Sequence, residues 1–346
     1  MLNIYKEKKI DFNNFIKLAI QNNFYINQNL FVKRKTNWDY GIFTKKQINP
    51  CEKLISIPKN YLISYKVMKD FILGKKVEYP NLELLKNYFL TIPSYNHFKN
   101  KSIIFISDNQ KKEILDFFVE KSPTRKNLQL FFDSINKLDD VDKYLELIFK
   151  SRSFNFDNSY CLAPILDMVN YKSREFKPYI NNENELYLKN KNVLKSNDEF
   201  FHGYESHNDI ISFYLNYNFI PNDFNRILIK PNFFFIKIPG KQSENLNEKY
   251  WFLNNGYFSN KINIIFEDYK IPLDLKLEIS KIAPNKNDQN KIIGSILDLK
   301  KNEVRFEKIK LFLKKNNTNT IIRNFVSVLE TNHRILTKTI DNINRS

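Results

Sequence analysis

Glycine and cysteine are both scarce in this chain of 346 residues, which contains 6 Gly and 2 Cys. So few glycines exclude collagen-like and glycine-rich low-complexity structure, and so few cysteines exclude a disulfide scaffold. Cys51 and Cys161 have no CxxC-type neighbour and the 4 histidines are scattered, so we expect no structural zinc site and no other metal. This cysteine usage is typical of a reducing compartment, so we expect an intracellular, cytoplasmic protein.

Long apolar runs are also absent. No stretch reaches the roughly 18 consecutive apolar residues that a transmembrane helix needs, so we expect no membrane partner. Residues 1–12 are charged and lack an apolar core, so we expect no secretory signal peptide. The chain is nevertheless rich in apolar residues, since 42% of it is hydrophobic and 15% is aromatic. That content allows a large buried core, which we expect to divide into two or three lobes.

The formal net charge is +17, and a strongly basic chain is a candidate for nucleic-acid binding. However, Lys is abundant together with Asn, Ile, Phe and Tyr, which is the pattern of an A/T-rich coding sequence. The basic residues are interspersed along the chain rather than gathered in one block. Compositional bias therefore explains the charge better than a nucleic-acid partner does, although the charge would still speed encounter with an acidic protein.

The N-terminal half contains both helix and strand signals. Asp11 is a good helix cap before an apolar stripe of helical spacing, so a helix is predicted there. Residues 38–43 and 54–58 are typical of short strands around a turn. Residues 67–150 have helical stretches and no strong strand pattern, which predicts an inserted helical lobe. Its last helix carries an apolar stripe over 141–149.

The C-terminal half reads mainly as helix. Asn208 and Asp209 are a good helix start, and Asn218 supplies the stop. An apolar, β-rich patch over 227–238 follows. Long amphipathic helices are predicted after it, and the last has its apolar residues on one stripe over 322–343.

Two segments combine an apolar run with polar groups at its end. Residues 162–171 read Leu-Ala-Pro-Ile-Leu-Asp-Met-Val-Asn-Tyr, a strand-like stretch that ends in Asp167 and Asn170. Residues 198–204 read Asp-Glu-Phe-Phe-His-Gly-Tyr, a second strand that delivers Tyr204. Apolar segments with a polar group at their ends are how a sheet protein lines a pocket, so these segments predict a functional site.

These two segments, with Ser151-Arg152-Ser153-Phe154 and Tyr217-Asn218-Phe219, resemble the signature motifs of SET-domain protein methyltransferases, in the branch of the plant Rubisco large-subunit lysine methyltransferase. The resemblance covers residues 10–346. It implies an α+β fold, in which a SET domain of small sheets carries an inserted helical lobe and precedes an all-α domain. The implied parts are an N-terminal SET half at 1–66, a helical insertion at 67–150, a C-terminal SET half with the active site at 151–222, and a helical substrate-binding domain at 223–346.

The resemblance also implies a cofactor, S-adenosyl-L-methionine, with S-adenosyl-L-homocysteine as its product and no metal. The residues implied to contact this cofactor are Trp38, Asp39, Tyr40, Gly41, Arg152, Asn170, Tyr171 and Tyr204. Tyr204 is the implied catalytic tyrosine. The residues implied to contact the substrate are Arg152, Phe154, Asp167, Tyr204 and Tyr217. The chain departs from the family where Asp39 replaces the first glycine of Gly-x-Gly, and where Tyr171 replaces a histidine.

The implied activity is N-methylation of a lysine side chain in a protein substrate, by an enzyme that we expect to be a monomer. Phe154 favours lysine, because relatives that methylate a histidine of actin have Asn at that position. His202 falls on the same strand face as Tyr204, but the family has no catalytic histidine there.

Two alternatives stay open. A catalytically silent SET-like module would keep the fold, lose the cofactor through Asp39 and Tyr171, and bind an acidic protein or a nucleic acid. Retention of Arg152, Asn170, Tyr204 and Tyr217 argues against it. A methyltransferase directed at a histidine or an N-terminal amine would use the same site on another acceptor.

Overall fold

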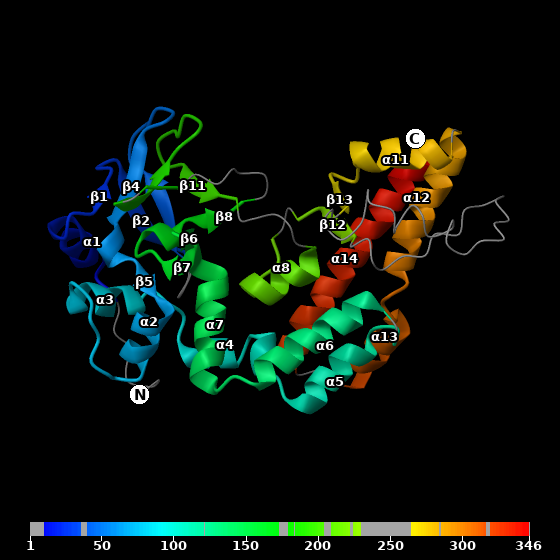
Figure 1. The fold of residues 1–346 in the computed structure, drawn as a ribbon, viewed down its shortest axis with the longest axis horizontal. Helices are drawn as coiled ribbons and strands as arrows, with labels where there is room; N and C mark the ends of the chain where they lie inside the picture. Colours follow the sequence, from blue (N-terminus) through cyan, green and yellow to red (C-terminus); the bar gives the residue numbers. More distant parts are fainter. Residues whose placement is uncertain are drawn as a thin grey trace. The chain divides into compact units, whose positions relative to one another are not determined.

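The computed structural model describes residues 10–35, 40–120, 122–172, 179–182, 184–203, 209–221, 224–229, 264–283, 285–315 and 319–345. The chain forms two compact units, each built from separate stretches of sequence (Figure 1). The first unit comprises Met1–Phe105 and Lys137–Ser206, and the second comprises Ile106–Asn136 and His207–Ser346. The four-part division inferred from the resemblance stays a prediction.

The first unit combines short helices with small sheets. Its helices and 3₁₀ turns are α1 (Phe12–Gln21), η1 (Lys59–Tyr61), α2 (Tyr65–Ile72), α3 (Leu82–Phe89), α4 (Tyr95–Lys99), η2 (Ile103–Phe105), α7 (Asp140–Arg152) and η3 (Leu166–Met168). Its strands are β1 (Tyr25–Ile26), β2 (Leu30–Arg34), β3 (Tyr40–Thr44), β4 (Lys53–Pro58), β5 (Ile63–Ser64), β6 (Ser153–Phe156), β7 (Ser159–Leu162), β8 (Asn170–Tyr171), β9 (Tyr179–Asn181), β10 (Glu185–Lys189) and β11 (Glu199–His202). They form sheets in the orders β1-β4-β10-β9, β2-β3-β11-β8 and β5-β7-β6.

Helix boundaries in this unit follow the capping residues that the sequence offers. The Asp11 side chain accepts hydrogen bonds from the backbone N–H groups of Asn13 and Asn14, and α1 begins there. In the same way α7 begins after Asp139 and ends at Arg152, where the backbone becomes extended. The helices predicted at both places are confirmed.

The stretch 162–171 is not the continuous strand that its apolar sequence predicted. Strand β7 ends at Leu162, a 3₁₀ turn follows, and only the last two residues form a strand. Pro164 has no N–H to give to a ladder, and Ile165 has a φ of 73°, a left-handed conformation. The prediction was wrong because an unbroken apolar run indicates only that the segment is buried on all sides. A turn inside the core is buried in this way just as a central strand is.

The sheet β2-β3-β11-β8 brings the two sequence motifs side by side. Strand β3 pairs antiparallel with β2 and β11, and β8 pairs parallel with β11. Phe201 lies opposite Asn170, and His202 lies opposite Tyr171. Residues 170–171 of the first motif and 199–202 of the second therefore occupy neighbouring strands.

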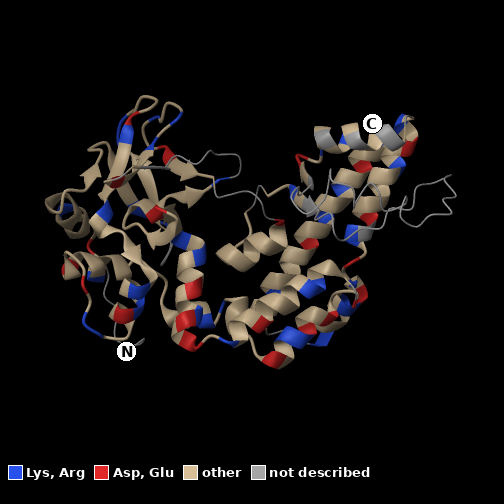
Figure 2. Cartoon of the chain, viewed as in Figure 1, with Lys and Arg blue, Asp and Glu red and all other residues tan. Residues whose placement is uncertain are grey.

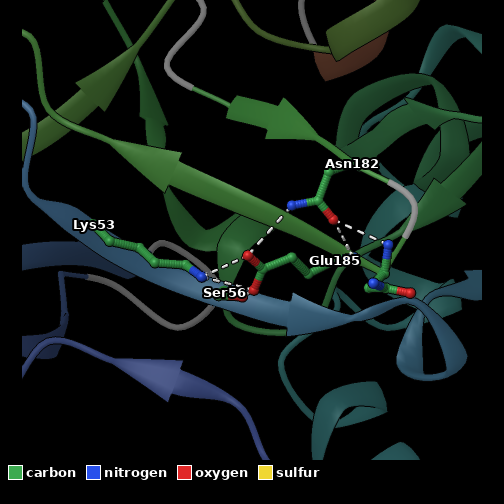
Figure 3. Close-up of polar contacts among 5 residues, drawn as sticks. Lys53, Ser56, Asn182 and Glu185 are labelled. Atoms are coloured by element: carbon green, nitrogen blue, oxygen red, sulfur yellow. Dashed lines mark hydrogen bonds and ion pairs between the residues drawn. The ribbon is translucent and has the colours of Figure 1, made fainter.

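A polar cluster fixes the register of β4 against β10 in the sheet β1-β4-β10-β9 (Figure 3). The Nζ of Lys53 lies 2.6 Å and 2.7 Å from the two carboxylate oxygens of Glu185. The Ser56 hydroxyl donates to the same carboxylate, and Asn182 accepts the backbone N–H of Glu185 at 3.0 Å. Burial raises the pKa of Glu185, but the bonds from Lys53 and Ser56 outweigh it and lower the pKa below its ordinary value.

The second unit is built mainly of helices. They are α5 (Asp108–Asp116), α6 (Pro123–Asn136), α8 (Ile210–Tyr217), α11 (Leu273–Ile282), α12 (Lys286–Lys301), α13 (Phe306–Lys315) and α14 (Thr320–Arg345). Strands β12 (Arg226–Ile229) and β13 (Ile264–Glu267) form an antiparallel pair. The helix predicted after Asp209 is confirmed, with Asp209 as its cap and Asn218 in the left-handed conformation at its end. The predicted last helix is confirmed as α14, against which α8 and α12 pack (Figure 1).

The segment that separates the two parts of the first unit in sequence packs within the second unit. The ring centroids of Phe118 and Phe325 are 6.4 Å apart. The Thr124 hydroxyl donates to the buried carboxylate of Glu303, and the backbone N–H of Val119 donates to the carbonyl oxygen of Glu303 at 2.8 Å. Helices α5 and α6 thus share a core with helices near the C-terminus.

The architecture is α+β, with small sheets among the helices of the first unit, so the predicted fold class is confirmed. In the described ranges, no helix is long and apolar enough to cross a bilayer. Lys and Arg residues are spread over both units with Asp and Glu among them (Figure 2).

Candidate active site

Asn170 links the two motifs to the first strand region. Its side-chain nitrogen donates to the carbonyl oxygen of Tyr40 at 2.8 Å and to Oε1 of Glu199 at 2.7 Å. These residues are the first residues of β8, β3 and β11. Asn170 and Tyr40 are 130 residues apart in sequence, so it is the fold that brings these two predicted cofactor residues together.

Gly41 follows Tyr40 and lies against the same carboxylate. A Cβ atom at this position would lie 2.5 Å from Oε1 of Glu199 and 2.9 Å from a ring carbon of Phe43. Both distances are shorter than van der Waals contact. The other carboxylate oxygen, Oε2, lies 2.6 Å from Nζ of Lys35. The glycine of the predicted turn therefore faces a fully paired carboxylate.

A buried ion pair joins two further predicted site residues. Nη1 of Arg152, the last residue of α7, lies 3.3 Å from Oδ2 of Asp167, and the two side chains are 15% and 0% exposed. The Tyr88 hydroxyl on α3 donates to the same Oδ2 at 2.6 Å. The second oxygen, Oδ1, has no hydrogen-bond partner among the described residues. Burial raises the pKa of Asp167, while Arg152 and Tyr88 pull it part of the way back.

The ion pair lies next to the Asn170 cluster. Asp167 belongs to η3, which packs against β3 and immediately precedes β8. Burial raises the pKa of the Tyr40 hydroxyl, and the cations of Arg34 and Arg152 lower it in part. Arg152 is thus within electrostatic reach of β3. The first unit therefore brings together, in one region, the predicted residues Tyr40, Gly41, Arg152, Asp167 and Asn170.

Aromatic side chains add apolar surface to this region. Phe154 is buried on β6, with its ring centroid 6.2 Å from that of the His202 imidazole. His202 is also buried, and its Nδ1 lies 3.2 Å from the carbonyl oxygen of Gly203. Tyr171 is half-buried on β8, opposite His202. This composition suits a site that keeps water away from a reacting group.

Four further residues were predicted for the site. Trp38, Asp39 and Tyr204 lie outside the described residues. Tyr217 belongs to the second unit, where its ring centroid is 4.5 Å from that of Phe213. The roles assigned to all the site residues stay predictions.

Sequence reasoning missed three residues that the structure places in these contacts: Tyr88, Lys35 and Glu199. Glu199 gave one usable signal, because a charged residue that enters an apolar strand needs a partner. Tyr88 gave none, because it is one of 19 tyrosines and sits in an ordinary apolar helix pattern. In the described part of the chain, no cluster of His, Cys, Asp and Glu side chains could hold a metal ion.

Comparison with known proteins adds a structural likeness. No protein-family model matches the sequence, and no curated protein matches it. Among solved structures, the SET domain of LSMT bound to methyllysine and AdoHcy is similar, with a TM-score of 0.56, 13% identity, and coverage of 97% of this chain and 92% of that one. This chain has the SET-domain fold. Rubisco LSMT bound to sinefungin and monomethyllysine (TM-score 0.55) and Rubisco LSMT bound to AdoMet (TM-score 0.54) are each 12% identical, over 96% of this chain and 91% of theirs.

The resemblance inferred from the motifs is thus confirmed at the level of the fold. It extends along nearly the whole chain, including the helical C-terminal region. At such low identity the likeness concerns the fold, and the chemistry rests on the side chains described above.

Proposed function

We propose that this chain is an S-adenosylmethionine-dependent protein N-methyltransferase that acts on a lysine side chain. The observation that carries the proposal is the hydrogen bond from Asn170 to the backbone of Tyr40, next to Gly41. The family resemblance implies all three residues as cofactor contacts, Tyr40 and Gly41 from one motif and Asn170 from another. Among structures of the same fold, two hold AdoHcy together with methyllysine or lysine, and a third holds AdoMet.

The described residues fit such a cofactor and an amine substrate. Oδ1 of Asp167 is a buried acceptor without a donor in the described part of the chain. Buried polar atoms nearly always have a partner, so an N–H group of a ligand is a natural donor for this oxygen. Asn170, Tyr40 and Gly41 would hold the cofactor, which supplies a methyl group from its sulfonium and leaves as S-adenosylhomocysteine.

The aromatic surroundings suit the acceptor chemistry. Only a neutral amine can take up a methyl group, yet free lysine has a pKa of about 10.4. Exclusion of water lowers the pKa of an amine, because burial disfavours its charged form. Phe154 and Tyr171 are the aromatic residues of the first unit that we assign to this desolvation. Tyr204 would orient the amine nitrogen for in-line attack, which is where most of the acceleration arises.

Binding of the cofactor product is the first test. Isothermal titration of the full chain with S-adenosylhomocysteine should give saturable heat with one site per chain. Asn170→Ala should weaken this binding strongly, whereas Asn192→Ala, an exposed asparagine in the loop before β11, should leave it unchanged. A wild-type protein that shows no saturable heat would favour the catalytically silent module.

Identification of the product is the second test. The protein should transfer labelled methyl groups from S-adenosylmethionine to a protein in a lysate of its source. Mass spectrometry of that product should place the methyl group on a lysine nitrogen. A methylated histidine or N-terminal amine would contradict the lysine assignment and leave the methyltransferase assignment standing.

A further inference from the structure

Glu199 lies at a point where every strand of one sheet contributes a contact. The residue begins β11, and its carboxylate accepts the Asn170 amide from β8 at 2.7 Å. It lies against Gly41 on β3 and pairs with Lys35, which directly follows β2, at 2.6 Å. The sheet order β2-β3-β11-β8 is therefore tied together through this single side chain.

The carboxylate is held on both of its oxygens. Oε1 takes the amide hydrogen bond and Oε2 takes the ammonium of Lys35. The Glu199 side chain is 11% exposed and that of Lys35 is 32% exposed. The Lys35 ammonium also lies 5.8 Å from the ring centroids of both Phe43 and Phe201. The Glu199 carboxylate is thus mostly shielded from solvent and paired with a lysine that is itself held in place.

The contact with Asn170 has a consequence for that side chain. A carboxamide nitrogen carries two hydrogens, and here one acceptor is the Tyr40 carbonyl oxygen and the other is the Glu199 carboxylate. Both hydrogens are therefore committed to the protein. This fixes the plane of the amide and directs its oxygen to the opposite side.

We propose that Glu199 is a positioning residue of the cofactor site, which sets the orientation of Asn170 and determines that residue 41 is glycine. This inference rests on the proposed function, since it assumes that Asn170 contacts the cofactor. A Cβ at residue 41 would lie 2.5 Å from Oε1 of Glu199. An alanine there displaces the carboxylate and thereby releases Asn170. The requirement for glycine comes from the protein's own side chains, since the Cβ would also lie 2.9 Å from a ring carbon of Phe43, whatever the cofactor itself demands.

Affinity for S-adenosylhomocysteine, measured by titration calorimetry on the full chain, tests this role. Glu199→Ala should weaken binding by about tenfold to a hundredfold, the loss of one hydrogen bond to a charged group. Glu199→Gln keeps an acceptor for Asn170 and should stay within about threefold of the wild type. In turnover, Glu199→Ala should raise KM for S-adenosylmethionine much more than it lowers kcat.

Glu185→Ala is the matched control, because Glu185 is also a strand glutamate paired with a lysine and a hydroxyl in the same unit. Glu185→Ala should lower the thermal unfolding midpoint of the protein without changing its affinity for S-adenosylhomocysteine. A purely structural role for Glu199 predicts equal affinity in both variants. Wild-type affinity in Glu199→Ala would overturn the inference, while absence of binding by the wild type itself would overturn the proposed function and the inference with it.

A double-mutant cycle gives a second, independent measurement. Gly41→Ala should weaken binding by about tenfold or more in the wild-type background, and by clearly less when Glu199→Ala is already present. Additive effects would overturn the proposed coupling between the two residues. If Glu199→Ala does not fold, Glu199→Asp takes its place in the same cycle, because the shorter side chain withdraws the carboxylate from a Cβ at residue 41 and the effect of Gly41→Ala should again be clearly smaller.

Discussion

The buried contact between Tyr88 and Asp167 allows a quantitative prediction. Replacing Tyr88 by Phe removes one hydroxyl from a fully buried side chain and leaves the ring in place. That hydroxyl donates to Oδ2 of Asp167 at 2.6 Å, and the only other donor to this carboxylate in the described structure is Arg152, at 3.3 Å. The carboxylate of the variant would therefore keep a single, longer contact.

The expected loss is large for one hydroxyl group. Hydrogen bonds to charged groups contribute about 1.5–3 kcal/mol, compared with about 1 kcal/mol for bonds between neutral groups. The Asp167 side chain is 0% exposed, so water does not replace the lost donor in the folded state. We therefore expect Tyr88→Phe to lower the free energy of unfolding by about 2–3 kcal/mol at neutral pH.

The loss should also depend on pH. Burial already raises the folded-state pKa of Asp167, and loss of the Tyr88 donor raises it further. A folded-state pKa above the unfolded value gives stability that is present at low pH and lost as the pH rises through the folded-state pKa. The deficit of the variant should therefore be smallest in acid, where Asp167 is protonated in both proteins, and should grow as the pH rises through the raised folded-state pKa values of the two proteins.

Tyr144→Phe is a close control. Tyr144 is buried in the same unit, and its hydroxyl donates to the neutral carbonyl oxygen of Pro93 at 2.8 Å. The free energy of unfolding of this variant should fall by about 1 kcal/mol, and this loss should not change with pH. Urea unfolding followed by circular dichroism measures both variants. If Tyr88→Phe and Tyr144→Phe lower the free energy of unfolding equally at acid and at neutral pH, the reasoning about a buried, ionised acceptor is refuted.

Three further predictions concern methyl transfer, the stability of the first unit and a helix of the second unit. Tyr204→Phe should raise the activation barrier of methyl transfer on the order of 2–4 kcal/mol, with unchanged affinity for S-adenosylhomocysteine; near wild-type single-turnover rates would contradict its role. Lys53→Met should lower the free energy of unfolding by about 1 kcal/mol in urea titrations at neutral pH. That deficit should vanish as the pH falls through the depressed folded-state pKa of Glu185, because the ion pair stabilises only an ionised carboxylate. Asp209→Ala removes the cap that accepts the Ser212 N–H and should speed hydrogen exchange in α8 by about tenfold, whereas Asp209→Asn should not.

Helix ends that depend on residues close in sequence could be predicted from the sequence alone. Asp11 and Asp209 cap helices through atoms two or three residues away, and Asn218 ends α8 by its own backbone conformation. Strand β1 could not be predicted from the sequence, because Tyr25–Ile26 is a strand only through its pairing with β4. The apolar run over 162–171 misled for a related reason, since its buried turn is defined by tertiary packing.

In the candidate site, too, some residues could be predicted from the sequence and others could not. Asn170 and Gly41 could be named because motifs surround them, although no local rule indicates that they meet. The contact of Tyr88 with Asp167 spans 79 residues and links a helix to a turn. Only the folded chain identifies such a pair, because the information lies in how the elements pack.

The discontinuous make-up of the two units affects biosynthesis. The first unit has all of its residues once Ser206 has been made, whereas α5 and α6 belong to the second unit, which extends to the C-terminus. Phe117 and Phe118 pack on Phe312 and Phe325, which the ribosome adds much later. At roughly 5–20 residues per second the interval lasts on the order of ten seconds or more. During translation the two phenylalanines that follow α5 remain without these partners, so we expect this segment to need a chaperone on the nascent polypeptide.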